Sequence, residues 1–226
     1  MKQYKIKWSI FLCLFAISHL VLAQKVKLST DHLEPNKVYM TLEKLAGKEV
    51  VKVIKDSTVS EVDEPTFVKI KDVDFKDGII EVMVLSKLHK SARPSDRGFI
   101  GLAFRINDDL SKFECIYIRP TNGRSDDQIR RNHSTQYFSY PDYKFSRLRK
   151  ETPEMYESYV DMGLNEWIKM KIEVKGSQAK LFLNDQKQPC LVVNDLKMGA
   201  DASGELGLFV DVGTEGYFRA LKITKK

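Results

Sequence analysis

The sequence predicts an all-β protein in which two antiparallel sheets pack face to face as a β-sandwich of the jelly-roll type. Short runs of alternating apolar and polar residues recur along the chain, and helical periodicity is nearly absent after residue 23. Turn-forming sequences such as Lys76-Asp77-Gly78 and Asn184-Asp185 separate these runs. Many short strands with few helices are typical of a sandwich or jelly roll.

Residues 1–23 have the organisation of an export signal. Lys2, Lys5 and Lys7 precede an apolar run from Trp8 to Leu22, and small residues close the segment at Ala23. The apolar run is shorter than the roughly 20 residues that cross a bilayer. We therefore expect a jelly-roll domain at residues 24–226, with no membrane span after cleavage, in the periplasm or outside the cell. We expect this domain to be a monomer.

The charge of the exported chain excludes one class of partner. The formal charge of +6 falls to +3 once the three signal lysines are removed. No basic stripe of the kind that binds nucleic acid is present, so we expect no nucleic-acid partner. Any electropositive site must come from local clustering of arginines.

Cysteine and histidine are too sparse to indicate a metal centre. Cys115 and Cys190 remain after the signal, and they form either one disulfide or two free thiols. His32, His89 and His133 show no ligand spacing with each other or with the cysteines. We expect no metal and no cofactor.

Ten segments carry the pattern of strands. We predict them at 50–54, 66–70, 79–85, 99–105, 113–119, 167–174, 179–183, 191–193, 205–212 and 217–223. Together they span most of the chain after the signal, and no linker divides them.

Alternation assigns faces to the two central strands. Ile100, Leu102 and Phe104 share the core face of the first strand, and Glu114 shares the core face of the second with two isoleucines. Glu114 is an anomaly there, because a buried carboxylate is costly unless it is paired or protonated. The opposite face carries small residues and polar or aromatic groups, which we predict to line a ligand groove: Arg105, Tyr117 and Arg119.

The order of several motifs resembles a known superfamily. The motifs are DVDFKDGIIE from Asp72, GFIGLAFR from Gly98, FECIYIRP from Phe113, the alternating strand after Trp167, and GELGLFV from Gly204 with Gly-Tyr-Phe at 216–218. In this order they resemble the concanavalin A-like lectin/glucanase superfamily, and within it the laminin-G-like and 3-keto-disaccharide hydrolase-like (DUF1080) proteins exported by Bacteroidetes-type bacteria. The resemblance implies a two-sheet jelly roll that meets a glycan. It implies no particular reaction, because the superfamily contains lectins, glycosidases, lyases and adhesion modules.

The catalytic motif of the superfamily's β-glucanases is incomplete here. That motif is Glu-x-Asp-x-x-Glu on one strand, and the nearest string in this chain begins at Glu61 and Asp63 but has Thr66 in place of the last acid. Pro65 also argues against a central strand at this position. We interpret the string as a loop, and the glucanase mechanism loses its support.

A long polar segment from Pro120 to Ser139 is the predicted site. Connections of this length in a compact domain are usually functional or disordered, and the aromatic residues that follow argue against disorder. Guanidinium groups bind carboxylate or sulfate, amides bind sugar hydroxyls, and aromatic rings stack on sugars. The alternative is that the arginines pair with Asp126 and Asp127 and only tie down a surface loop. With the groove residues, the predicted ligand-binding set is Arg105, Tyr117, Arg119, Asn122, Arg124, Gln128, Arg130, Asn132, Tyr137 and Tyr140.

Residues in and near this segment are compatible with two kinds of catalysis. A glycosidase needs two carboxyl groups across a cleft, and a uronate lyase needs a group that neutralises the sugar carboxylate together with a base. No spacing singles out a pair. The catalytic candidates are Glu114, Asp127, His133 and Tyr137, with Asp126 and Glu157 as further acids.

The sequence therefore predicts an exported jelly-roll protein that binds or processes a neutral or anionic carbohydrate in a concave groove rimmed by an arginine-rich loop. A glycan-degrading hydrolase or lyase and a non-catalytic adhesion or structural module are the alternatives.

Overall fold

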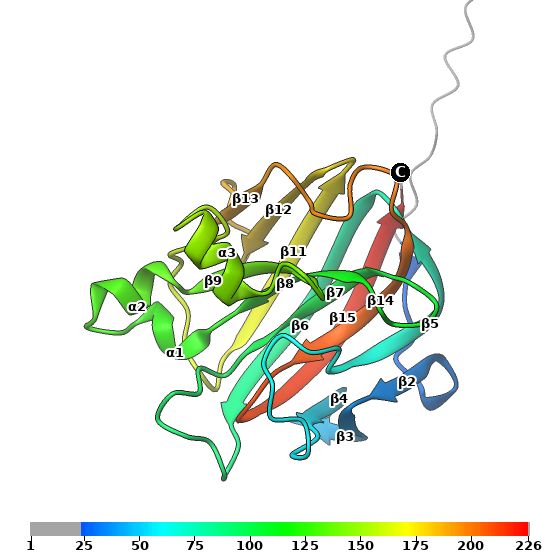
Figure 1. Ribbon diagram of the computed structural model, residues 1–226. Helices are drawn as coiled ribbons and strands as arrows, with labels where there is room; N and C mark the ends of the chain where they lie inside the picture. Colours follow the sequence, from blue (N-terminus) through cyan, green and yellow to red (C-terminus); the bar gives the residue numbers. More distant parts are fainter. Residues whose placement is uncertain (1–23, 226) are drawn as a thin grey trace, which may run out of the picture.

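Two antiparallel sheets stack face to face in the computed structural model, which describes residues 24–225 (Figure 1). The export signal predicted at residues 1–23 lies outside the described residues. The eight-stranded sheet runs β13 (Leu191–Val193), β12 (Gln178–Leu183), β11 (Trp167–Lys175), β6 (Gly78–Leu88), β15 (Thr214–Lys225), β4 (Lys48–Lys55) and β3 (Val38–Leu45), with β1 (Gln24–Lys25) paired to β15. The seven-stranded sheet runs β10 (Glu157–Ser158), β9 (Thr135–Tyr140), β8 (Phe113–Ile118), β7 (Ile100–Ile106), β14 (Gly204–Val210), β5 (Phe67–Phe75) and β2 (Leu33–Asn36).

The predicted β-sandwich is confirmed, and each of the ten predicted strands corresponds to a strand of the structure. The helices are short: η1 (Thr30–His32), α1 (Pro120–Gly123), α2 (Gln128–Asn132) and α3 (Phe145–Glu151). Among residues 24–225, no helix has the length and apolar character required to cross a membrane.

The polar segment from Pro120 to Ser139 is more ordered than the long loop that we predicted. It folds into α1 and α2 and then enters β9, which pairs with β8 along its whole length. Asp127 caps α2, since its side chain accepts hydrogen bonds from the backbone N–H groups of Ile129 and Arg130. The sequence of β9 is rich in polar residues, which hides its strand character.

The faces assigned to β7 and β8 are confirmed by their register. Leu102 lies opposite Ile116, and Phe104 lies opposite Glu114, on the side facing the other sheet. Glu114 is fully buried, and its carboxyl group accepts hydrogen bonds from the Tyr137 hydroxyl and, at 2.8 Å, from the backbone N–H of Met198. Burial raises the pKa of Glu114 despite these bonds. The buried carboxyl group is therefore a satisfied core residue.

Arg105 does not share a face with Tyr117, contrary to the alternation. The register of β7 and β14 shifts next to it, and its φ is +54°, so a β-bulge turns the side chain away from the predicted groove. Its guanidinium is fully buried and donates to the carbonyl oxygens of Lys76, Gly176 and Gly199 at 2.8–3.1 Å. Arg105 thus ties three turns together at one end of the sandwich.

The outer face of the seven-stranded sheet carries a layer of aromatic rings. Phe113 contacts Phe67 and Phe138 edge to face, with centroids 5.3 and 5.6 Å apart, and Tyr117 stacks on Phe209 at 5.6 Å. All five of these rings are buried. The chain itself covers the layer with residues 56–66 and α3, which lie in front of this sheet in Figure 1.

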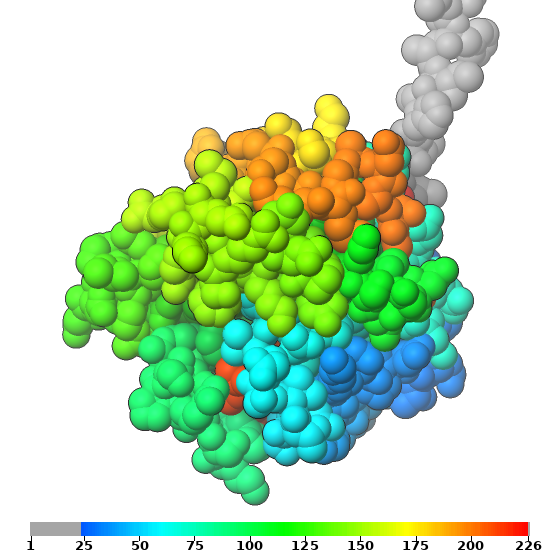
Figure 2. All heavy atoms as spheres, in the orientation of Figure 1, coloured from blue at the N-terminus to red at the C-terminus, as the bar shows by residue number. Residues whose placement is uncertain are grey.

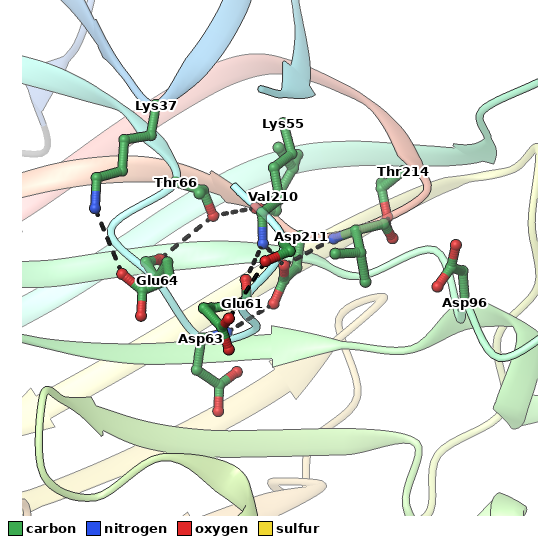
Figure 3. A network of polar contacts seen from close by, with 12 residues as sticks. Lys37, Lys55, Glu61, Asp63, Glu64, Thr66, Asp96, Val210, Asp211 and Thr214 are labelled. Atoms are coloured by element: carbon green, nitrogen blue, oxygen red, sulfur yellow. Dashed lines mark hydrogen bonds and ion pairs between the residues drawn. The ribbon is translucent and has the colours of Figure 1, made fainter. Parts of the chain in front are cut away.

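Residues 56–66, the covering segment, are held by buried polar contacts (Figure 3). Lys55 Nζ lies 2.6 Å from Asp211 Oδ1, and the other oxygen of Asp211 accepts from the Asp63 N–H at 2.9 Å. The Phe145 N–H at the start of α3 donates to Asp63 Oδ2 at 2.7 Å, while Asp63 Oδ1 is buried without a partner. Burial and the nearby Asp211 carboxylate raise the pKa of Asp63 to about 7.

Cys115 and Cys190, the two cysteines among residues 24–225, are free thiols, which settles the alternative left open by the sequence. Cys115 lies in the buried centre of β8, and burial raises the pKa of both thiols.

The pH dependence of stability tests the environment of Asp63. Its pKa is higher in the folded protein than in the unfolded chain, so the folded state holds a proton that the unfolded state releases as the pH rises from about 4 to 7. The free energy of unfolding should therefore fall over this range, by at most about 4 kcal/mol from this group. Asp63→Asn should remove that fall, as measured by urea unfolding at pH 5 and pH 8.

The exposed Asp126 provides the control, because Asp126→Asn should leave the pH dependence of unfolding as it is in the parent protein. An equal pH dependence in Asp63→Asn and the parent would show that Asp63 does not retain its proton in the folded state.

Candidate functional site

A cavity of about 330 Å³ opens beside the covered face of the seven-stranded sheet. Its wall is built by the connection between β6 and β7, the end of β8, α1, α2, α3 and the residues that follow β14. The lining is unusually rich in guanidinium groups: Arg93, Arg97, Arg119, Arg130 and Arg149. Aromatic side chains complete it, namely Phe99, Tyr117 and Phe145.

Arg119 forms the buried floor of this cavity, which we call the arginine cavity. It is 4% exposed, and its guanidinium donates to the His133 carbonyl, the Gln136 side-chain oxygen and the Tyr117 hydroxyl at 2.9–3.0 Å. A further bond of 3.0 Å goes to Glu157 Oε1. These contacts fix the orientation of Arg119.

Glu157 is shared by two arginines. Arg149 Nε donates to its Oε2 at 2.9 Å, and Arg149 Nη2 donates to the same Oε1 that Arg119 contacts. Burial opposes ionisation, but the bonds from Arg149 and the charges of both arginines outweigh it and lower the pKa of Glu157. One carboxylate therefore balances two guanidinium groups, and a positive charge is left over.

Arg97 and Arg130 add to that excess. The Arg97 guanidinium donates to the backbone carbonyls of Pro94 and Asp96, and Arg130 has a buried Nε with no hydrogen-bond partner. Neither forms an ion pair with a carboxylate among residues 24–225. Burial, then the neighbouring charge of Arg130 and also that of Arg119, lower the pKa of Arg97. Such crowding of like charges is what an anion would relieve.

The carboxylates that line the arginine cavity are already engaged. Asp96 accepts from the backbone N–H of Arg93 at 2.8 Å and from its guanidinium at 3.1 Å. Asp211 is bound to Lys55. Both carboxylates are therefore ion-paired with a cation of the protein.

The structure brings five of the predicted site residues together around this cavity: Tyr117, Arg119, Asn122, Arg130 and His133. His133 Nδ1 lies 3.0 Å from Glu157 Oε2 without hydrogen-bond geometry. Burial and the charges of Arg149 and Arg119 lower the pKa of His133, although Glu157 acts in the opposite direction.

The other predicted ligand-binding residues lie elsewhere. Arg105 is buried among the turns described above, and Arg124 forms exposed ion pairs with Asp161 and Glu166 at 2.9 and 3.1 Å. Gln128 and Asn132 bond to each other along α2 at 2.7 Å. Tyr140 stacks on Phe113, and Tyr137 lies between the sheets with Glu114.

Of the catalytic candidates, only His133 lines the cavity. Glu114 and Tyr137 bond to each other in the core, and Asp127 caps α2. Of the two further acids, Asp126 is exposed on the surface, and Glu157 lies behind Arg119 and Arg149.

Sequence reasoning missed several residues of the cavity. Arg93, Asp96 and Arg97 stand in the short string RPSDR before β7, and Arg149 belongs to α3, which was not among the predicted site residues. The only signal was the density of arginine in both stretches. Nothing local shows that residues 93–97 and α3 face the same cavity.

Metal-ligating side chains do not cluster in the described part of the chain. No group of three or more His, Cys, Asp or Glu residues in residues 24–225 is arranged to hold a metal ion.

Comparison with solved structures supports the jelly-roll fold. The carbohydrate-binding module CBM66 from Bacillus subtilis is similar with a TM-score of 0.52 and 14% identity, over 84% of this chain and 97% of that one. Domain 4 of AbnA, a GH43 extracellular arabinanase from Geobacillus stearothermophilus, has a TM-score of 0.46 and 10% identity, over 85% and 81%. No protein-family model and no curated protein matches the sequence. At this identity the first likeness establishes the two-sheet fold and nothing about the site.

Removal of the charge of Glu157 tests the electrostatic account of the cavity. Glu157→Gln should leave Arg119 buried without a counter-charge, and breaking a buried pair in this way costs about 3 to 5 kcal/mol. We expect a matching loss of the free energy of unfolding in urea titration.

Glu166→Gln is the matched control, because it breaks the exposed pair with Arg124 and should cost less than about 1 kcal/mol. Equal losses for the two variants would argue against a buried charge network.

Proposed function

We propose that this protein is an exported carbohydrate-binding protein whose ligand presents a carboxylate or sulfate group to the arginine cavity. The observation that carries the proposal is the pair of guanidinium groups, Arg97 and Arg130, that line this cavity without a carboxylate partner. A planar guanidinium is suited to bind a carboxylate or sulfate with two parallel hydrogen bonds.

The remaining lining suits a sugar ring. Phe99 and Phe145, which are half-buried, supply aromatic surface beside the arginines. The volume of about 330 Å³ is near the lower end of the roughly 300–1,000 Å³ of ligand pockets. The export signal expected at residues 1–23 would deliver such a protein to the periplasm or the cell exterior.

The contacts in the cavity favour binding of the carbohydrate without its chemical conversion. A glycosidase or lyase needs a carboxyl group or base free to act on the sugar. Asp96 and Asp211 are held by Arg93 and Lys55, and His133 lies against Glu157. An adhesion module with no ligand would be expected to keep its arginines paired internally, which Arg97 and Arg130 are not.

Arg130→Ala tests this function. In isothermal titration calorimetry, we expect the parent protein to bind glucuronate-containing or sulfated oligosaccharides and to show no binding of neutral cello-oligosaccharides. Loss of a charge-assisted contact should weaken binding roughly 10- to 100-fold. Affinity should also fall as salt is raised.

Arg131→Ala is the matched control, because the neighbouring arginine contacts Tyr159 and does not line the cavity. Equal weakening by both variants, or tight binding of neutral chains, would contradict the proposal. Release of reducing ends or of unsaturated uronate would instead show that the protein is an enzyme.

A further inference from the structure

A second cavity, of about 490 Å³, lies directly beside the arginine cavity. It is bordered by residues 54–60 on one side and by residues 89–93 on the other, with residues 212–214 at its base. In Figure 2, red atoms from the C-terminal part of the chain show at the bottom of a hollow between the cyan and blue-green segments, where this cavity lies.

The two cavities share a thin wall. Arg93, Asp96 and Val212 line both of them, and the Arg93 guanidinium and the Asp96 carboxylate form an ion pair of 3.1 Å within this wall. Gly213 allows the close packing there, since a Cβ on this residue would lie 2.2 Å from Asp96 Oδ2, and its φ is +66°. A ligand bound in one cavity is therefore separated from the other by little more than one ion pair.

The chemistry of the second cavity differs from that of the first. The exposed serines Ser57, Ser60 and Ser91 line it, together with Tyr39, which is 59% exposed. Its two strong cations are already committed, because Lys55 is paired with Asp211 and Arg93 with Asp96.

Asp56 makes this second cavity unsuited to an anion. Its carboxylate accepts from the Thr58 N–H at 2.9 Å and from the Thr58 hydroxyl at 2.8 Å. These bonds, first the backbone one and then the hydroxyl one, lower the pKa of Asp56, so the group is ionised at neutral pH. The hydroxyl-lined cavity thus accepts hydroxyl groups and repels negative charge, next to a cavity that attracts it.

We propose that the ligand is an oligosaccharide that spans both cavities, with its anionic residue among the arginines and a neutral sugar residue in the hydroxyl-lined cavity against Tyr39. This inference rests on the proposed function and adds the order of anionic and neutral sugar residues along the oligosaccharide. Sugar hydroxyls pair with the serine hydroxyls, and an apolar sugar face stacks on the exposed tyrosine.

The test compares three probes by isothermal titration on the chain from residue 24 to 226: glucuronic acid, a hyaluronan tetrasaccharide and tetragalacturonic acid. Hyaluronan alternates glucuronate with a neutral amino sugar, whereas tetragalacturonate places an anion at every position. We expect the hyaluronan tetrasaccharide to bind about tenfold more tightly than either other probe, because among the three probes it alone can stack a neutral sugar on Tyr39 while it keeps an anion among the arginines.

Variants separate the two cavities. Tyr39→Ala should weaken the tetrasaccharide roughly tenfold and leave glucuronic acid unchanged, and Leu42→Ala is the control, because it removes an exposed side chain of the same strand outside the hydroxyl-lined cavity. Asp56→Asn should improve binding of tetragalacturonate, since it removes the repelling charge.

Each outcome has a distinct meaning. If Arg130→Ala weakens all three probes while Tyr39→Ala changes none, the two-cavity inference is overturned and the proposed function stands. Equal affinity of the parent for the hyaluronan and galacturonate chains would also overturn the inference. If none of the three binds, the two-cavity inference is overturned; if the sulfated oligosaccharides of the preceding test do not bind either, the proposed function fails as well.

Discussion

The ion pair between Lys55 and Asp211 joins the two sheets beside both cavities. Lys55 lines the hydroxyl-lined cavity, and Asp211 lines the arginine cavity. Lys55 ends β4 in the eight-stranded sheet, and Asp211 follows β14 in the seven-stranded one. Both side chains are almost completely buried, so each needs the other to offset its loss of solvation. The same carboxylate receives the Asp63 N–H and so holds the covering segment over the aromatic layer.

That covering segment decides where a ligand can bind. In an open jelly roll, the outer face of the seven-stranded sheet would be a broad groove. Here the rings of Phe113, Tyr117 and Phe209 are buried under residues 56–66 and α3. The free surface is displaced to the side of this cover, where the arginine cavity and the hydroxyl-lined cavity lie next to each other. The covered face supplies rigidity, and its border supplies the candidate site.

The arginine cavity combines a rigid floor with positive charge at its edge that has no carboxylate partner. Arg119 has four protein partners and keeps one orientation, because moving it would strip a buried guanidinium of its bonds. Arg97 and Arg130 are half-buried and lack such partners. Because Arg119 is already held in place and the cations at the edge lack a carboxylate partner, the cavity favours binding of an anion with little rearrangement of the protein. Glu157 offsets part of the positive charge of the cavity, because it is ion-paired with both Arg119 and Arg149.

Several features of this protein could be read from its sequence because they depend on local pattern. Period-two alternation identified ten strands, although not β3, and the faces of β7 and β8, since side chains on a strand must point to opposite sides. It failed at Arg105, where a bulge reverses the side chain, and at β9, whose Gln136 and Ser139 are polar although buried. Five members of the arginine cavity were found because they stand close together between Tyr117 and His133.

Only the tertiary structure decided which residues complete the site. Arg93, Arg97 and Arg149 are separated in sequence from Arg119 by tens of residues, and their convergence depends on how the connection before β7 and α3 pack on the sheet. The roles of Glu114 and Tyr137 were likewise set by packing, which turned two catalytic candidates into one buried hydrogen-bonded pair. Local pattern determines strands and faces because it acts between neighbours. Charge balance in a cavity is a sum over segments that meet only after folding, and no stretch of sequence contains it.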